Sequence, residues 1–309
     1  MIQAHLFRLI QTLFILNLLL TNNLIHAKPA LWTKQSARFE LINSHPGNNI
    51  NWIFLPGGPG LGSKYLREFA LSLKLPGQTW LLDMPGDGSN QLTKKPVDYS
   101  QWPHDLAEAV NSLDHVVLVA HSFGGMLALS SPELQSHLSG LILIDTAPNN
   151  EWMHSSAGSC SNCDIPKTTP TMTNYEKNPS DSGLKQIALS MGPLFFSPDQ
   201  VKEGTRLLED LPYNHLPYDW INKNFNPTYQ AKWIPQSIPT LIISGAVDLL
   251  TPISLFQQDK RFNRPNIKTI LIPHTGHFSW INHQSEFQTI FNNFTQKISI
   301  SARQNAKQY

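Results

Sequence analysis

Short apolar runs recur along the chain, and each ends in a polar or glycine-containing turn. Runs of about four to eight β-branched and large apolar residues between turn residues predict buried strands. The run at 115–120 shows no polar alternation, which is typical of a strand covered by helices on both faces. By this pattern we expect strands at 50–55, 79–83, 115–120, 141–145, 240–244 and 269–272.

Helical patterns lie between and after these strands. Apolar residues recur at helical spacing in a segment that begins near Ser100, and again close to the C-terminal end. Alternation of strands with helices predicts an α/β fold with a mostly parallel sheet flanked by helices. The apolar helix positions are 106, 109, 110 and 113 in the first segment and 287, 290, 291 and 294 in the second.

One segment interrupts this alternation. Between about Pro148 and Pro235 there is no strong strand pattern, and the residues are rich in Pro, Asn, Ser and aromatics, with a helical pattern at 200–211. Because the segment lies between two core strands, we interpret it as an inserted lid or cap. The expected organisation is an α/β core over 28–147 and 237–309, interrupted by a largely helical cap over 148–236.

Residues 1–27 have the features of a secretory signal peptide. They contain no Asp or Glu, Arg8 supplies a positive charge, and the apolar run from Leu9 to Leu20 is too short to span ~30 Å of hydrocarbon comfortably. Cleavage is expected near Ala27. The protein is then exported, periplasmic or secreted, without a stable membrane span; an uncleaved N-terminal anchor is the alternative.

Composition excludes several classes of protein. With 23 Lys and Arg against 22 Asp and Glu in 309 residues, the chain lacks the basic surface that nucleic acid binding requires. The only cysteines, Cys160 and Cys163, are too few for a structural zinc site. In an exported protein we expect them to form a local disulfide, with a redox pair as the alternative. No metal or cofactor is expected.

Ser122 is the expected nucleophile. The sequence Ala120-His121-Ser122-Phe123-Gly124 follows the strand at 115–120 and precedes a helical pattern. A nucleophile elbow needs small neighbours because its sharp turn keeps the serine in a strained backbone conformation. The alternative role for Ser122 is a helix N-cap. His121 is expected to pack with its side chain pointing away from the elbow.

A glycine-rich run at 57–60 follows the strand at 50–55. Glycines let backbone N–H groups face a substrate, and two such groups can stabilise the anionic tetrahedral intermediate of acyl transfer. We assign this oxyanion hole to the N–H groups of Gly58 and Phe123, with Gly57 as the neighbouring option. The run matches neither order of glycines that is typical of nucleotide-binding loops.

The remaining triad residues follow later strands. Asp248 lies in the loop after 240–244, and His277 comes 29 residues later, beyond one more strand. A triad needs a histidine that reaches the serine and an acid that orients the histidine. Two alternatives exist: His274 for the base, and Asp145 for the acid. We prefer His277, and expect a structural role for Asp145.

With these pieces in this order, the sequence resembles the α/β-hydrolase superfamily over about residues 36–300. The glycine run is also similar to the H-G-G-P-G motif of proline iminopeptidase-like members, with Pro56 in place of the histidine. In the D-x-P-G-x-G-x-S loop, Asp83 is expected to bond local backbone. Residues 83–89 match the first seven positions of this loop motif. The other matching motifs are the elbow at 120–124, G-x-x-D at 245–248 and G-H-F at 276–278.

The expected function is that of an exported serine hydrolase that cleaves an ester or amide bond through an acyl-enzyme. A small carboxylic ester is the first substrate class, and a short peptide with a free amino end, as in the proline iminopeptidase-like branch, is the second. A catalytically silent binding or effector protein on the same fold is the alternative of another class. Aromatic residues of the cap either line a substrate pocket or form the cap's own core.

Overall fold

The computed structural model describes residues 30–46, 49–91, 96–154 and 170–305. The expected signal peptide and both cysteines, Cys160 and Cys163, lie outside the described residues, so cleavage and the disulfide stay predictions. Over the parts of the chain that are described, no helix combines the length and apolarity needed to cross a membrane.

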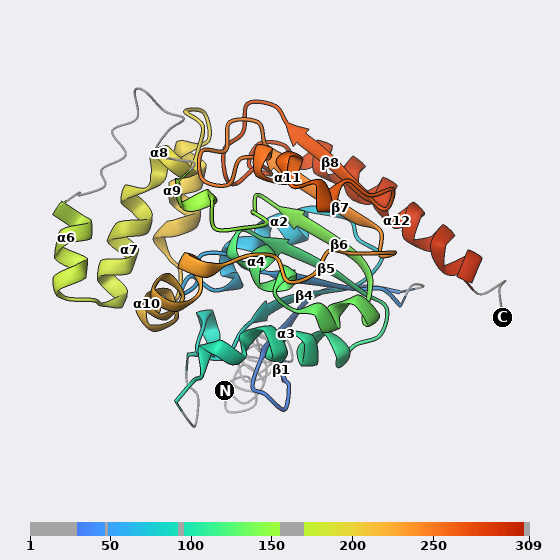
Figure 1. The fold of residues 1–309 in the computed structure, drawn as a ribbon, viewed down its shortest axis with the longest axis horizontal. Coiled ribbons are helices and arrows are strands. Elements are labelled where there is room, and N and C mark those ends of the chain that lie inside the picture. Colours follow the sequence, from blue (N-terminus) through green and yellow to red (C-terminus); the bar gives the residue numbers. More distant parts are fainter. Residues whose placement is uncertain (1–29, 47–48, 92–95, 155–169, 306–309) are drawn as a thin grey trace, which may run out of the picture. The chain divides into compact units, whose positions relative to one another are not determined.

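Eight strands form one sheet in the order β1-β2-β4-β3-β5-β6-β7-β8. Strands β3 to β8 pair in parallel, whereas β2 pairs antiparallel with β4. This arrangement confirms the α/β class and the mostly parallel sheet (Figure 1). The strands are β1 (Ala30–Trp32), β2 (Arg38–His45), β3 (Asn51–Leu55), β4 (Gly77–Asp83), β5 (Val116–His121), β6 (Leu138–Ile144), β7 (Thr240–Gly245) and β8 (Ile267–Ile272).

The six expected strands correspond to β3 through β8, with ends that differ by at most three residues. Strands β1 and β2 were not expected from the sequence. In β2 only Phe39 and Ile42 are buried, and they lie three positions apart, which breaks the two-residue alternation typical of a half-buried strand. The register of β2 against β4 also shifts between Leu41 and Asn43, so no simple alternation marks this strand.

Helices cover both faces of the sheet. On β5, Val116, Leu118 and Ala120 pack into the same buried cluster as residues of α3, α4 and α11, while Val117 and Val119 pack with α2 and α12 on the other face. This explains the unbroken apolar run of β5. These helices are α2 (Arg67–Ser72), α3 (Trp102–Asn111), α4 (Phe123–Leu129), α11 (Ser254–Gln258) and α12 (Gln284–Asn305).

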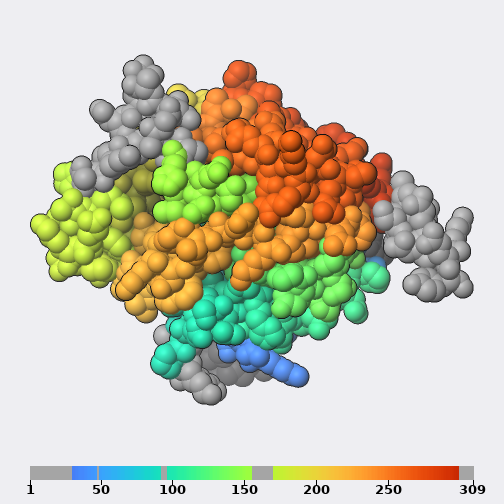
Figure 2. Space-filling view, viewed as in Figure 1, coloured from blue at the N-terminus to red at the C-terminus, as the bar shows by residue number. Residues whose placement is uncertain are grey.

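The segment between β6 and β7 is helical in its described part, and we refer to residues 148–236 as the cap segment. Its helices group on one side of the sheet in Figure 1, and in Figure 2 the yellow-green and orange-yellow surfaces of the segment lie on that same side. A bridge between Asn149 and Gln230 joins the two ends of the segment. The helices are α6 (Pro170–Lys177), α7 (Asp181–Ser190), α8 (Gly192–Phe195), α9 (Val201–Glu209) and α10 (His215–Asn224).

Candidate active site

Ser122 lies in the sharp turn between β5 and α4. Its backbone angles, φ 52° and ψ −124°, fall in a region that residues other than glycine rarely adopt. The turn requires a small residue two positions later, because a Cβ on Gly124 would lie 2.5 Å from the carbonyl oxygen of Pro56. Ser122 makes no side-chain capping bond to α4, so its hydroxyl is not used as an N-cap.

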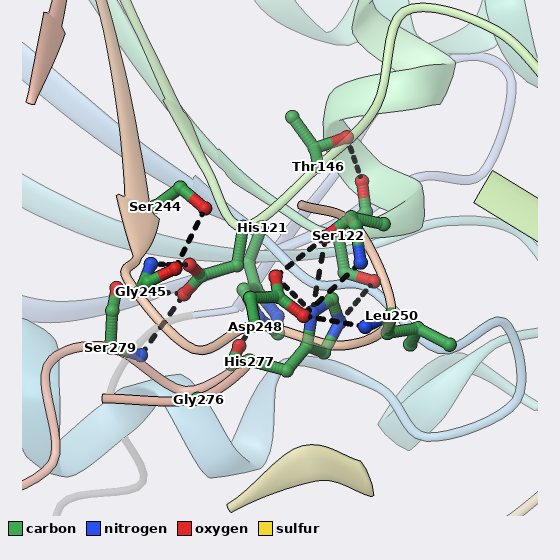
Figure 3. A network of polar contacts seen from close by, with 12 residues as sticks. His121, Ser122, Thr146, Ser244, Gly245, Asp248, Leu250, Gly276, His277 and Ser279 are labelled. Carbon is green, nitrogen blue, oxygen red and sulfur yellow. Dashed lines mark hydrogen bonds and ion pairs between the residues drawn. The ribbon is translucent and has the colours of Figure 1, made fainter. Parts of the chain in front are cut away.

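The structure brings Ser122, His277 and Asp248 together. Nε2 of His277 lies 2.8 Å from Oγ of Ser122, and Nδ1 lies 3.0 Å from Oδ2 of Asp248 (Figure 3). The three residues follow β5, β8 and β7, at the carboxyl ends of parallel strands, where ligands bind in open α/β sheets. The histidine therefore lies between the serine and the aspartate, as a base must when it serves a nucleophile and is oriented by an acid.

Four hydrogen bonds fix the Asp248 carboxylate. Oδ1 accepts the N–H groups of Leu250, at 2.8 Å, and of Thr251, at 3.1 Å. Oδ2 faces His277 and also accepts the Thr251 hydroxyl at 2.8 Å. No role was expected for Thr251 from the sequence. The only sequence signal was a hydroxyl residue three positions after the acid, in the same loop.

Burial and charge shift the pKa values of the acid and the base in opposite directions, and both shifts favour the charged form. Burial lowers the pKa of His277, but the charge of Asp248 and its hydrogen bond outweigh burial, and the pKa lies above its ordinary value. Burial raises the pKa of Asp248, but the charge and hydrogen bond of His277 outweigh this, and the pKa lies below its ordinary value. The pair therefore favours an ionised acid beside a histidine that can hold a proton.

The glycine loop after β3 lies directly against the elbow, since a Cβ on Gly57 would overlap the Cβ of Ser122. The Gly57 N–H donates to the Tyr65 hydroxyl at 2.6 Å and is therefore occupied. Phe123 is the first residue of α4, in the turn whose N–H groups have no partner within the helix. This geometry favours Gly58 over Gly57 as the partner of Phe123 in the expected oxyanion hole.

A buried chain of hydrogen bonds links this loop to the histidine. The Tyr65 hydroxyl lies 2.7 Å from Nδ1 of His121, and Nε2 of His121 lies 2.9 Å from the carbonyl oxygen of His277. Because a carbonyl only accepts, Nε2 carries the proton and Nδ1 accepts from Tyr65. Burial, reinforced by the charge of His277, lowers the pKa of His121 to about 3, so the ring is neutral.

His121 therefore does more than the expected packing. Its ring packs edge-on against Trp280, with centroids 4.8 Å apart, and both of its nitrogens also make hydrogen bonds. The residue joins the glycine loop to the backbone at His277. Sequence reasoning missed this link because it depends on Tyr65, a residue 56 positions away.

Asp145 lies behind the triad and contacts two of its loops. Oδ1 accepts the N–H of Gly245 at 2.8 Å, and Oδ2 accepts the N–H of Ser279 at 3.0 Å and its hydroxyl at 2.7 Å. Gly245 precedes the Asp248 loop and Ser279 follows His277 (Figure 3). Asp145 is fully buried and does not replace Asp248 beside His277. The geometry thus fits the expected structural role.

The other candidates lie away from the triad. His274 is exposed, whereas only 2% of His277 is exposed. Asp83 bonds the N–H and hydroxyl of Ser89, as expected from local turn chemistry, and also the distant N–H of Ser63. Among the described residues, no group of three His, Cys, Asp or Glu side chains is placed to hold a metal ion.

A cavity of about 180 Å³ opens beside Ser122 and His277. It is smaller than the ~300–1,000 Å³ that is typical of pockets for drug-sized ligands, so it suits a small substrate. Most of its wall is apolar. The cap aromatics only partly match the two expected roles. Trp152, Phe195 and Tyr218 line the cavity. Phe196 and Tyr213 are buried in an apolar cluster that the cap shares with the sheet, and Trp220 packs against a second such cluster.

These features define an α/β hydrolase with a triad-like site. The model of the alpha/beta hydrolase family matches residues 52–287, and the chain belongs to this family. A search of curated proteins found no match.

Solved structures share the fold. A hydrolase of the alpha/beta fold family from Bacillus anthracis str. Sterne is 17% identical, with a TM-score of 0.66 over 86% of this chain and 98% of its own. An esterase from Exiguobacterium antarcticum is 16% identical, with a TM-score of 0.64 over 87% and 99%. A proline iminopeptidase from Mycobacterium smegmatis is 16% identical, with a TM-score of 0.58 over 89% and 100%.

Proposed function

We propose that this chain is an exported serine hydrolase that cleaves small carboxylic esters through Ser122, His277 and Asp248. The observation that carries the proposal is the buried contact series from Ser122 Oγ to His277 Nε2, at 2.8 Å, and from His277 Nδ1 to Asp248, at 3.0 Å. Membership of the α/β hydrolase family supports hydrolysis as the class of reaction. The export part rests on the signal-like composition of residues 1–27.

In the first half-reaction, His277 Nε2 takes the proton of the Ser122 hydroxyl while Oγ attacks the ester carbonyl carbon. The carbonyl electron pair moves onto oxygen, and the N–H groups of Gly58 and Phe123 stabilise that negative charge. When the intermediate collapses, the carbon–oxygen bond to the alcohol breaks. The leaving alcohol takes the proton from His277, and Ser122 keeps the acyl group.

In the second half-reaction, a water molecule replaces the alcohol. His277 takes a proton from the water, whose oxygen attacks the acyl carbon. The same N–H groups stabilise the second oxyanion, the bond to Oγ breaks, and His277 returns the proton to Ser122. Throughout the cycle Asp248 stays ionised, orients the imidazole ring and stabilises its protonated form.

The described lining of the cavity favours an ester over a peptide with a free amino end, because it contains no carboxylate. A buried ammonium group needs a carboxylate partner, yet no Asp or Glu occurs among the described residues that line the cavity. The described acids of the cap segment that make side-chain contacts have partners elsewhere. Asp181 bonds His215, Asp199 bonds Ser197, Glu203 bonds Arg206, Asp210 bonds Lys64 and Asp219 bonds Tyr175. The aminopeptidase is therefore the second candidate.

The test uses the chain from Lys28 onward, with Ser122→Ala as the variant and Ser112→Ala as the control, since Ser112 caps the end of α3. Ester turnover on p-nitrophenyl butyrate should fall by about 10⁴-fold or more in Ser122→Ala and persist in Ser112→Ala. Faster cleavage of proline p-nitroanilide would identify the aminopeptidase instead. Full activity in Ser122→Ala would refute the mechanism, and no fluorophosphonate labelling at Ser122 would favour a silent binding protein.

A further inference from the structure

One wall of the cavity carries a row of polar side chains. Tyr218 and Asn222 lie on α10, and Asn226 begins the short 3₁₀ helix that follows it. The three residues are four positions apart, a spacing that places helical side chains on one face. All three line the cavity that also contains Ser122 and His277.

Hydrogen bonds connect the three side chains of this row, but they leave one buried oxygen without a partner among the described residues. Asn226 Nδ2 donates to Asn222 Oδ1 at 2.8 Å, and Asn222 also makes a hydrogen bond with the Tyr218 hydroxyl. Oδ1 of Asn226 is buried and has no partner among the described residues, although only 4% of the residue is exposed. Buried carbonyl oxygens almost always accept a hydrogen bond, so an unused one beside a substrate cavity calls for a donor.

We propose that the substrate supplies this donor: Asn226 Oδ1 accepts a hydrogen bond from a hydroxyl or N–H group of the bound ester. The inference rests on the proposed ester hydrolysis and specifies its substrate class. The donor belongs to a neutral group, because no Asp, Glu, Lys or Arg lies among the described residues that line the cavity. The preferred substrate is thus a small, largely apolar ester that carries one hydroxyl or amide N–H.

Matched esters test this preference. In each pair a hydroxyl is replaced by a methyl group of similar size: methyl 3-hydroxyhexanoate against methyl 3-methylhexanoate, and methyl 6-hydroxyhexanoate against methyl heptanoate. Because either side of the ester can occupy the cavity, 2-hydroxyethyl butyrate against propyl butyrate completes the set. Methyl 3-oxohexanoate supplies an acceptor in place of a donor. The measured quantity is the ratio of kcat/KM within each pair.

The wild type should favour the hydroxylated member of at least one pair by about ten-fold or more, since an unpaired buried acceptor penalises the analogue that lacks the donor. Asn226→Leu, which has a similar shape without the carbonyl, should bring that ratio close to one. Asn224→Leu is the matched control on α10, because Asn224 is exposed and its side-chain amide donates to the backbone carbonyl of Trp220. This control should keep the wild-type ratio.

Three results would overturn the inference: no preference in any pair for the wild type, a preference for the 3-oxo ester over the 3-hydroxy ester, or an unchanged ratio in Asn226→Leu. The wild-type ratios decide the matter even where Asn226→Leu does not fold. If the wild type cleaves all these esters without discrimination, only this inference fails. If it cleaves none of them and Ser122 resists fluorophosphonate labelling, the proposed function itself fails.

Discussion

Ser122 and His277 are both in states that they would not adopt in a free peptide. Ser122 has a positive φ of 52°, and the imidazole of His277 is almost fully buried yet has a raised pKa. Backbone strain of this kind persists only where the surrounding structure enforces it. At Ser122 the strain directs Oγ toward His277, and at His277 the carboxylate of Asp248 offsets the burial that would otherwise favour the neutral ring.

The pKa of His277 leads to a pH-dependent prediction. Only the neutral imidazole accepts the serine proton, so fluorophosphonate labelling of Ser122 should slow as the pH falls through the pKa of His277. The charge of Asp248 raises this pKa. Asp248→Asn should therefore lower the pKa, move the midpoint of labelling to lower pH, and slow labelling by about 10³- to 10⁴-fold.

The control for this prediction is Asp259→Asn. Asp259 is partly buried, pairs with Arg261 at 2.6 Å, and does not contact the triad. The Asp259→Asn substitution should leave both the rate of labelling and its pH midpoint unchanged. A midpoint that stays in place in Asp248→Asn would contradict the assignment of Asp248 as the acid that sets the pKa of His277.

Elements meet at the elbow with almost no free space. The first turn of α4 lies against the end of β3, and the glycine loop that follows β3 lies against Ser122. This turn needs glycine at position 124 because a Cβ would be too close to its neighbours. The two nearest atoms are backbone carbonyl oxygens, which cannot rotate away. The small residues around Ser122 thus reflect the packing of a helix onto a strand end.

Gly124→Ala should lower the free energy of unfolding by about 1–3 kcal/mol, since the new methyl group forces α4 away from β3. The displacement should also reduce esterase activity, because Phe123 belongs to the same turn. Gly192→Ala is the matched control: its Cβ would lie 4.0 Å from the nearest atom, and the change should stay within about 0.5 kcal/mol. Urea unfolding measures both variants, and equal stabilities would contradict this account.

Across the whole molecule, buried polar groups connect loops that belong to distant parts of the chain. Asp145 bonds Gly245 and Ser279, 100 and 134 positions later, and thereby connects the ends of β6 and β7 to the loop of His277. His121 makes a similar connection between the glycine loop and His277. The positions of Ser122, Asp248 and His277 therefore depend on groups that take no part in the proposed chemistry.

Asp145→Asn should lower kcat by about ten- to a hundred-fold with little change in KM. The amide keeps the size of the carboxylate, but its NH₂ group faces donors where an acceptor is required, so the loops of Asp248 and His277 shift slightly. Shifts of about 1 Å at a catalytic group can cost about 100-fold in rate. Asp259→Asn again serves as the control, because Asp259 does not contact the triad.

Steady-state kinetics on p-nitrophenyl butyrate, with circular dichroism to verify folding, measures this effect. A folded Asp145→Asn enzyme with wild-type kcat would show that Asp145 does not position the triad loops. A rise in KM with kcat unchanged would place its effect on substrate binding instead.

The sequence alone determined the order of the core strands along the chain, the location of the insertion and the identity of Ser122, Asp248 and His277 as candidates. These features are local: apolar runs mark buried strands, and turn chemistry marks the loops that follow them. The antiparallel β2 escaped detection because its two buried residues, Phe39 and Ile42, lie three positions apart and do not show the alternation of a strand.

Only the tertiary structure decided the relations between distant residues. In the structure His277, and not His274, lies beside Ser122. The Gly57 N–H donates to the Tyr65 hydroxyl, and Asp145 bonds the loops on either side of it. The tertiary structure also placed Asn226 in the cavity wall and left its side-chain carbonyl oxygen without a partner among the described residues. Hydrogen-bond partners and burial depend on how elements pack, and residues that are neighbours in space but not in sequence leave no periodic signal in a single chain.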